Sequence, residues 1–201
     1  MVALTFDDGP GVLSPMAIRQ LREHNATATF FLVGKLIGQS QFDGIIRDEM
    51  RLGAAFGDHT WNHVSMLGAG ARKYRSEIVR TRRAVSRATG SPVELFRPPL
   101  GEHDAGLDSF LRSNGMLEIL WSVDSQDSQG AGAKKIFRNV RISLSAGDII
   151  LLHDNRGTTE KALPAILDLI ARRGLTPVTV PELLTQDPPS HAQLRAHTCP
   201  G

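Results

Sequence analysis

The feature that most constrains the fold is the alternation of short apolar runs with longer segments of helical periodicity along most of the chain. Short runs rich in β-branched and aromatic residues predict strands, and apolar residues recurring every three or four positions predict helices. Strands are predicted over residues 2–6, 28–33, 54–57, 94–96, 117–123, 149–153 and 176–180. Helices are predicted between them, over residues 14–24, 41–52, 71–89, 105–113, 133–144 and 159–173, with a short closing helix at 181–184. Such an order gives a parallel sheet covered by helices, either a barrel or an open doubly wound sheet.

Length and composition indicate one globular domain. The chain has 201 residues, of which 41% are apolar and 22% charged, as in ordinary soluble domains. We assign residues 1–186 to this domain and 187–201 to a polar C-terminal tail without periodicity. The tail contains Cys199, the only cysteine, which excludes an intrachain disulfide and a cysteine-rich metal site.

Charge and hydropathy exclude some classes of partner. The net charge of +2 is too small to predict nucleic-acid binding, and no apolar run is long enough to span a bilayer. We expect a monomer. The chain begins almost directly on its first predicted strand, with no signal-like leader before it, so a leader or upstream domain could have been removed and the compartment stays open.

The chemically reactive side chains gather at one kind of position. They follow the carboxyl ends of predicted strands, where both candidate architectures place their active sites. These residues are Asp7, Asp8, His59, Arg97, Asp124 and His153.

Two adjacent carboxylates, Asp7 and Asp8, end the first strand and are followed by Gly9 and Pro10. Neighbouring strand residues point to opposite faces, so the two acids can do different work at one site only if the strand end bends. Gly9 permits such a bend. The alternative is an ordinary Asp-Gly-Pro turn in which Asp7 caps the next segment of the chain.

Two histidines four residues apart suggest a metal site. On a helical turn His59 and His63 would share one face and could bind one ion. Asp8 would supply a third ligand, which leaves a position open for water or substrate, as in catalytic zinc sites. Co²⁺ and other divalent first-row ions accept the same ligands. The alternative is a pair of histidines without metal.

A metal that activates water needs a base beside it, and Asp7 is the candidate. A neighbouring cation would keep this base ionised and oriented, and Arg97 suits that role; a salt bridge to another acid is the alternative. Arg97 is followed by Pro98, Pro99, Leu100 and Gly101. The prolines stiffen this loop, Gly101 allows close approach of backbone to a ligand, and the Leu100 N–H could face a developing oxyanion.

The last candidates follow the fifth and sixth predicted strands. His153 is placed to act as a general acid that protonates the leaving group, although a single histidine after a buried strand is often structural. Asp127 could fix the tautomer of a catalytic histidine, and Asp124 could serve as a helix-cap or loop residue.

Taken together, these stretches resemble the motifs of the polysaccharide deacetylases, the NodB-homology family or carbohydrate esterase family 4. The motifs are Thr-Phe-Asp-Asp-Gly-Pro, His-x-x-x-His, Arg-Pro-Pro-x-Gly, the segment around Asp127, and Leu-Leu-His-Asp. They run from Asp7 to Asp154, and the strand–helix series extends the match to about Leu184.

The resemblance implies a distorted, incomplete (β/α) barrel of about seven parallel strands and metal-dependent hydrolysis of acetyl groups on sugars. By motif position Asp7 resembles the base, held by Arg97, and His153 resembles the acid, tuned by Asp127. Asp8, His59 and His63 resemble the ligands of one divalent ion, expected to be Zn²⁺, and Leu151 would line the acetyl pocket.

The chain departs from the family pattern at two positions. Ser128 stands where the family usually has Trp, and Leu100 where it usually has Tyr. The Leu100 N–H survives this change, whereas loss of the indole at position 128 predicts a wider or wetter acyl site.

The expected function is therefore deacetylation of a carbohydrate, such as chitin oligomers or the N-acetyl sugars of peptidoglycan. Alternatives are an O-acetyl esterase of the acetylxylan type and a deacetylase of a small natural product. A non-catalytic relative that binds carbohydrate or metal is a further alternative, of another class. The resemblance favours a secreted or cell-envelope protein.

Overall fold

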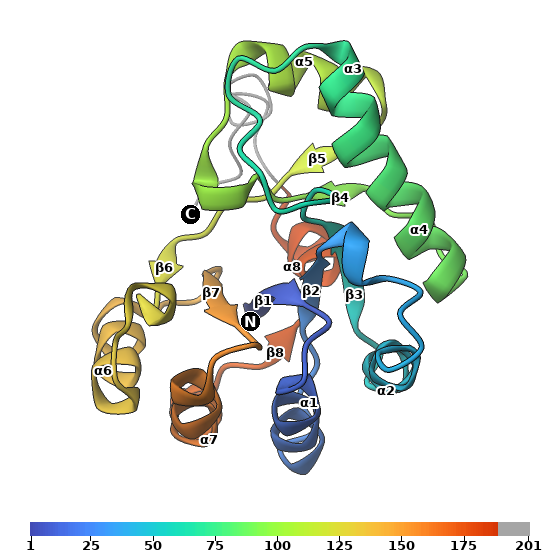
Figure 1. Cartoon of the computed structure of the whole chain (residues 1–201). Coiled ribbons are helices and arrows are strands. Elements are labelled where there is room, and N and C mark those ends of the chain that lie inside the picture. The colour runs from blue at the N-terminus through green and yellow to red at the C-terminus, as the bar shows by residue number, and fades with distance from the viewer. Residues whose placement is uncertain (189–201) are drawn as a thin grey trace.

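The computed structural model describes residues 1–188 and shows a curled parallel sheet with helices packed around its outside (Figure 1). Seven strands form the main path of the sheet in the order β5-β4-β3-β2-β1-β7-β6, and β8 pairs with the N-terminal end of β1. The strands are β1 (Val2–Gly9), β2 (Thr29–Leu32), β3 (Ala55–Asp58), β4 (Leu95–Phe96), β5 (Leu117–Glu118), β6 (Val123–Asp124), β7 (Ile149–His153) and β8 (Pro177–Val178). The predicted incomplete barrel is confirmed.

The helices agree with the predicted series within a few residues. They are α1 (Ser14–Glu23), α2 (Asp43–Arg51), α3 (Ala71–Tyr74), α4 (Arg80–Thr89), α5 (Ala105–Ser113), α6 (Ala133–Ser143), α7 (Gly157–Arg172) and α8 (Val180–Gln186). The helix predicted over 71–89 contains a π-helical turn at Arg75–Val79, between α3 and α4, and ends at Gly90 in the left-handed conformation (φ 71°). None of the helices in residues 1–188 is both long and apolar enough to cross a membrane.

The single strand predicted over residues 117–123 is wrong. Its two ends form β5 and β6, which lie at opposite edges of the sheet, and residues 119–122 cross between them. β5 pairs with β4 and β6 pairs with β7, but β5 and β6 do not pair with each other along this path. The barrel is therefore open between β5 and β6, and we call this gap, crossed by residues 119–122, the seam. A local sequence pattern could not reveal the seam, because its position depends on the curl of the whole sheet.

The two faces of the sheet form separate cores. In β1, Leu4 and Phe6 face the helices outside, whereas Ala3 faces the inside of the curl. Phe30 and Phe31 divide in the same way in β2, as the two-residue period of a strand requires. Inside the curl, Val180 and Leu183 of α8 pack in one cluster with Ala3 and Phe31. The N-cap of α8 is Thr179, whose side chain accepts from the Glu182 N–H in a capping box. α8 replaces the end of the strand predicted over 176–180.

The parallel register brings the strand ends together at one edge. Asp7 of β1 is in register with His153 of β7 on one side and with Phe31 of β2 on the other. Asp58 at the end of β3 is in register with Phe96 of β4. The reactive residues that come after these positions therefore meet at the carboxyl edge of the sheet.

Candidate active site

The two acids at the end of β1 are separated by a bulge. The register of β1 against β2 shifts between Asp7 and Gly9, and Asp8 takes a left-handed conformation (φ 72°). The predicted bend exists, but it falls on Asp8 and not on Gly9. Gly9 is required for space, because a Cβ there would lie 3.0 Å from Asp154 Oδ2. The bulge lets Asp7 and Asp8 serve neighbouring positions of one site.

His59 and His63 come from a loop after β3, so the helical turn on which their four-residue spacing would place them on one face is not how they meet. Thr60 and His63 have left-handed φ values of 61° and 57°. Asp58 Oδ1 accepts from the Thr60 N–H at 2.8 Å. The carboxylate of Glu77 also fixes the loop, because it accepts from the backbone N–H and the side-chain amide of Asn62. Two strained residues held by buried acids thus bring the imidazoles together, with their ring centroids 5.0 Å apart.

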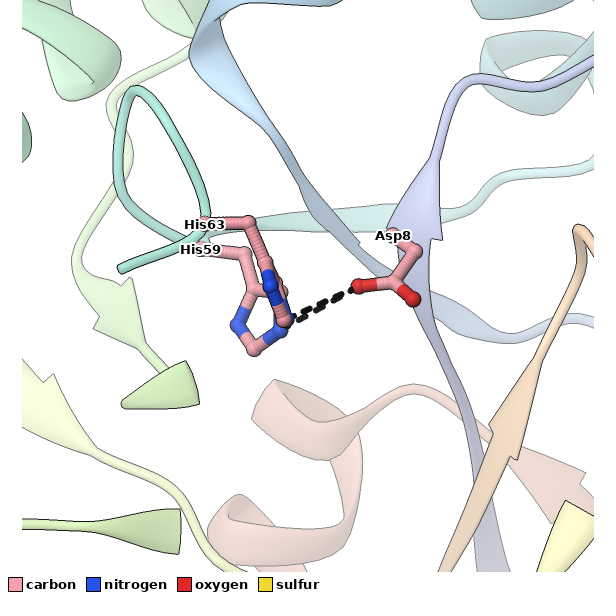
Figure 2. Close-up of side chains that lie close together, drawn as sticks. All are labelled: Asp8, His59 and His63. Carbon is pink, nitrogen blue, oxygen red and sulfur yellow. Dashed lines mark ion pairs between the residues drawn. The ribbon is translucent and has the colours of Figure 1, made fainter. Parts of the chain in front are cut away.

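Figure 2 shows both imidazoles facing the carboxylate of Asp8. Asp8 Oδ1 lies 3.1 Å from His63 Nε2 and 3.7 Å from His59 Nε2. The His59 Nδ1 lies 2.8 Å from the Arg97 carbonyl oxygen, which can only accept, so Nδ1 carries the proton and Nε2 keeps its lone pair. Among the described residues, 1–188, the buried Asp8 Oδ1 has no hydrogen-bond partner. These donors fit a divalent cation.

The charge state of His59 also suits a metal ligand. Burial lowers the pKa of His59 from its ordinary value, although the charges of Asp7 and Asp8 oppose this change. A neutral imidazole is the form that binds metal. The site therefore favours the protonation state that a cation requires.

Arg97 is fully buried and bonds with all of its side-chain nitrogens. Nη1 donates to Asp7 Oδ1 at 2.8 Å and to Thr5 Oγ1 at 2.7 Å. Nε and Nη2 donate to the carbonyls of Ile119 and Leu120, at 3.0 and 2.9 Å. The same guanidinium therefore holds the carboxylate of Asp7 and satisfies the backbone of the segment that crosses the barrel seam.

His153 is held by Asp127 on the opposite side of the site. Asp127 Oδ1 lies 2.8 Å from His153 Nδ1, and Oδ2 accepts from the His153 N–H at 2.8 Å and from Thr159 Oγ1 at 2.6 Å. Burial lowers the pKa of His153, but the hydrogen bond and charge of Asp127, with the charges of Asp7 and Asp8, raise it above its ordinary value. These contacts direct Nδ1 toward Asp127 and leave Nε2 for a ligand.

A cavity of about 430 Å³ joins these groups. Its walls include the predicted site residues Asp7, Asp8, His59, His63, Pro98, Leu100, Ser128, Leu151 and His153. Arg97 and Asp127 are buried and hold the lining residues Asp7 and His153, while Gly101 packs against Trp121. Leu100 is 73% exposed and takes a left-handed conformation (φ 65°).

Sequence reasoning missed three residues of the cavity wall, Trp121, Gln129 and Arg156. A Cβ on Gly101 would lie 3.0 Å from the Trp121 ring, so this glycine makes room for the indole. The cavity therefore has an aromatic wall although position 128 is a serine. Asp124 also lines the cavity, and its Oδ1 accepts from the Gln126 N–H at 2.7 Å, a loop role as predicted.

The sequence model of the polysaccharide deacetylase family matches residues 1–119. A peptidoglycan-N-acetylglucosamine deacetylase of Bacillus cereus is 32% identical over 187 residues, covering 90% of this chain and 67% of that protein. The corresponding enzyme of Listeria monocytogenes is 32% identical over 183 residues, covering 90% of this chain; the chain spans only 38% of its length.

Solved structures of the same kind superpose on most of the chain. A family 4 carbohydrate esterase from Streptomyces lividans in complex with acetate has a TM-score of 0.82 and 36% identity over 88% of this chain and 90% of that one. A family 4 acetyl xylan esterase from Clostridium thermocellum with a cobalt ion has a TM-score of 0.84 and 30% identity, covering 92% and 90%. A family pseudoenzyme from Bacillus anthracis has a TM-score of 0.84 and 25% identity, covering 92% and 65%.

Proposed function

Because this chain belongs to the polysaccharide deacetylase family, whose catalytic members are hydrolases acting on acetyl groups of carbohydrates, we propose that it is a metal-dependent deacetylase of N-acetyl sugars. The resemblance seen in the sequence motifs is thereby confirmed. The observation that carries the proposal is the pairing, across one cavity, of an arginine-held carboxylate with an aspartate-held histidine beside a three-ligand cluster.

Asp8, His59 and His63 are proposed to hold one divalent ion, Zn²⁺ in the first instance, or Co²⁺. Their three ligand atoms lie within 4.8 Å of one another, and the buried Asp8 Oδ1 has no other partner. When bound, such an ion supplies Lewis acidity toward the acetyl carbonyl and makes water more acidic.

The remaining roles rest on hydrogen bonding. Asp7 accepts a proton from the attacking water, because Arg97 keeps its carboxylate ionised and oriented. His153 donates a proton to the departing amine, because Asp127 favours its protonated form. The amine is a poor leaving group without this proton.

The substrate would lie between these two groups. The Leu100 N–H, in the turn from Pro98 to Gly101, is proposed as a donor to the developing oxyanion. Leu151 and Ser128 are proposed to border the acetyl methyl group. An exposed turn with a positive φ and a cavity open to solvent suit a large polymeric substrate.

Peptidoglycan is the first candidate substrate, since both relatives compared above are peptidoglycan-N-acetylglucosamine deacetylases. An O-acetyl esterase on xylan is the second candidate, favoured by the likeness to the acetyl xylan esterase structure. The same base and acid serve both reactions, because an ester also needs activated water and a protonated leaving oxygen.

The test is acetate release from peptidoglycan, chitin oligomers and acetylated xylan by the purified chain. We expect release from an N-acetylated glycan, loss of release with a chelator, and recovery when Zn²⁺ or Co²⁺ is added back. Release from xylan alone would favour the esterase, and no release from the whole panel would contradict the proposal and leave a small natural-product deacetylase or a non-catalytic relative.

Two variants test the assignment of roles. Asp7→Asn should bind metal as the parent does and lose activity by at least about 100-fold, as expected for removal of a general base. His63→Ala should lose both stoichiometric metal and activity. Parent-like activity of Asp7→Asn, or full metal content of His63→Ala, would contradict the corresponding role.

A further inference from the structure

A second cluster of ligand-type side chains lies outside the cavity just described. It consists of His103, Asp108 and Glu118, whose ligand atoms lie within 4.8 Å of one another. None of the three lines the cavity of the candidate active site. They come from the loop before α5, from α5 itself and from the end of β5, at the edge of the sheet opposite β6 (Figure 1).

Glu118 is the unusual member of this cluster. It is only 6% exposed, and within residues 1–188 neither of its buried carboxylate oxygens has an ordinary hydrogen-bond donor; the groups close to it are the imidazole of His103 and the carboxylate of Asp108. A carboxylate buried in this way is costly unless another group satisfies it.

The distances within the cluster suit the ligands of one shared cation. His103 Nδ1 lies 3.3 Å from Asp108 Oδ1, a long hydrogen bond, and 3.3 Å from Glu118 Oε1. Two ligands about 2.0–2.1 Å from a tetrahedral Zn²⁺ lie about 3.3–3.4 Å apart. The Asp8 cluster has comparable separations, 3.1 and 3.7 Å.

The backbone around the cluster is fixed independently of any ion. Asp104 caps α5, because its Oδ1 accepts from the Leu107 N–H at 2.9 Å. Its Oδ2 accepts from the Gly68 N–H at 2.7 Å, which ties the loop to a second segment. His103 and Asp108, on either side of this cap, are therefore held close to Glu118 in advance.

We propose that His103, Asp108 and Glu118 form a second site for a divalent cation of the Zn²⁺ type, separate from the candidate active site. One histidine and two carboxylates bind such an ion with a position left for water. The bound ion links the loop before α5 to β5. Since His103 lies three residues after Leu100, the ion also steadies the turn from Pro98 to Gly101. The proposal does not depend on the reaction proposed above.

The experiment uses the full chain with Asp8→Asn and His63→Ala together, which removes the first ligand cluster. Binding of Zn²⁺ alone is measured by calorimetry and by metal content after dialysis. We expect one equivalent in this double variant and two in the parent. Addition of Glu118→Gln, or separately of His103→Ala, should abolish the remaining equivalent. The matched control Glu102→Gln, one residue before His103 and outside the cluster, should keep it.

Thermal unfolding gives a second readout. Zn²⁺ should raise the Tm of the double variant, because an ion that binds only the folded chain stabilises it by mass action. The rise should disappear with Glu118→Gln and persist with Glu102→Gln. Far-UV circular dichroism without metal checks that each variant is folded, and His103→Ala stands in if Glu118→Gln is not. A double variant that binds no Zn²⁺, or a bound equivalent that survives both Glu118→Gln and His103→Ala, would overturn the proposal.

Discussion

The pairing of Asp127 with His153 decides how the proposed activity depends on pH. A general acid must be protonated, and the raised pKa of His153 keeps it so above its ordinary range. Proposed activity should therefore fall on the alkaline side as pH rises through the pKa of His153. The carboxylate of Asp127 is the main group that opposes the effect of burial.

Asp127→Asn should move this alkaline fall to lower pH. The amide keeps a similar shape but removes the negative charge, so the pKa of His153 drops and protonated His153 is lost earlier. The measurement is the pH profile of kcat/KM, with the exposed Asp168→Asn on α7 as the control. A profile that only falls in height, with its alkaline limb in place, would show that Asp127 does not set the pKa of the acid.

We predict that position 128 affects the selectivity for acyl groups. Ser128 lines the cavity with Leu151, and Trp121 supplies an indole from another part of the wall. Ser128→Trp should fill space beside the acyl group and raise the preference for acetyl over butyryl substrates. One methylene in an apolar slot is worth about 0.8 kcal/mol, so we expect a change of a few-fold to about tenfold in the ratio of kcat/KM values. An unchanged ratio would indicate that Trp121 alone shapes this part of the cavity.

Among the elements, β3 and β2 come unusually close at Gly57. A Cβ at this position would lie 2.3 Å from the ring of Phe31, and the guanidinium of Arg97 stacks on that ring with its Cζ 4.2 Å from the centroid. Any side chain on Gly57 therefore displaces Phe31 and disturbs the residue that holds Asp7.

Gly57→Ala should lower the free energy of unfolding by about 1–3 kcal/mol, as overpacking of a core does. Urea unfolding measures this change. Gly44→Ala in α2 is the matched control, because its Cβ would meet nothing closer than Arg47 Nη2 at 3.9 Å. It should leave stability unchanged or raise it slightly. An equal free energy of unfolding for the two variants would mean that the Phe31 ring moves aside without loss of stability.

The order of elements was predictable because each has a local signal. The run 149–152 is apolar and forms β7 together with His153, within the predicted bounds, and Gly90 ends α4 as its freedom at positive φ allows. The split of 117–123 into β5 and β6 has no local signal, since both ends are apolar and strand-like. Pairing at opposite edges is decided by contacts between residues far apart in the chain.

The candidate site was likewise predictable only in part. His59, His63 and His153 were found because their chemistry is visible at strand ends. The loop conformation that brings His59 to His63 was not predicted, because the spacing of the two histidines does not show that Thr60 and His63 take a left-handed φ. Trp121 was missed because it lies on the segment that crosses the seam, whose path was itself not predicted.

For the whole molecule, buried acids make stability depend on pH. Glu160 of α7 is 3% exposed, and neither carboxylate oxygen has a hydrogen-bond partner in the part of the chain that the structure describes. Burial above all, with the charge of Asp154 and against that of Arg19, raises the pKa of Glu160 to about 8. Between the unfolded pKa of about 4.3 and this value the folded state holds a proton that the unfolded state has released. Stability from this group is therefore full at low pH and is lost as pH rises toward 8.

Glu160→Gln should remove this dependence. Below pH 4 the variant and the parent should differ little, and at pH 8 the variant should be more stable by roughly 1–3 kcal/mol, the usual penalty for an unsatisfied buried polar group. Urea unfolding at several pH values measures the difference. The exposed Glu23→Gln on α1 should show no difference that grows with pH, and a constant difference for Glu160→Gln would contradict the assignment.

The guanidinium of Arg97 contributes both to the candidate active site and to the folded structure, and this double role affects which residues selection preserves. It satisfies the carbonyls of Ile119 and Leu120 where the barrel has no strand pairing, and it also holds Asp7. Selection for a folded chain therefore preserves Arg97 even in a lineage where selection for turnover has ended. His153 carries no such second duty to the seam and is free to drift, whereas loss of Asp7 would leave the buried guanidinium without its carboxylate. Among relatives, which include a pseudoenzyme, an arginine at this position would record shared architecture, and the fate of His153 would be the better record of inherited chemistry.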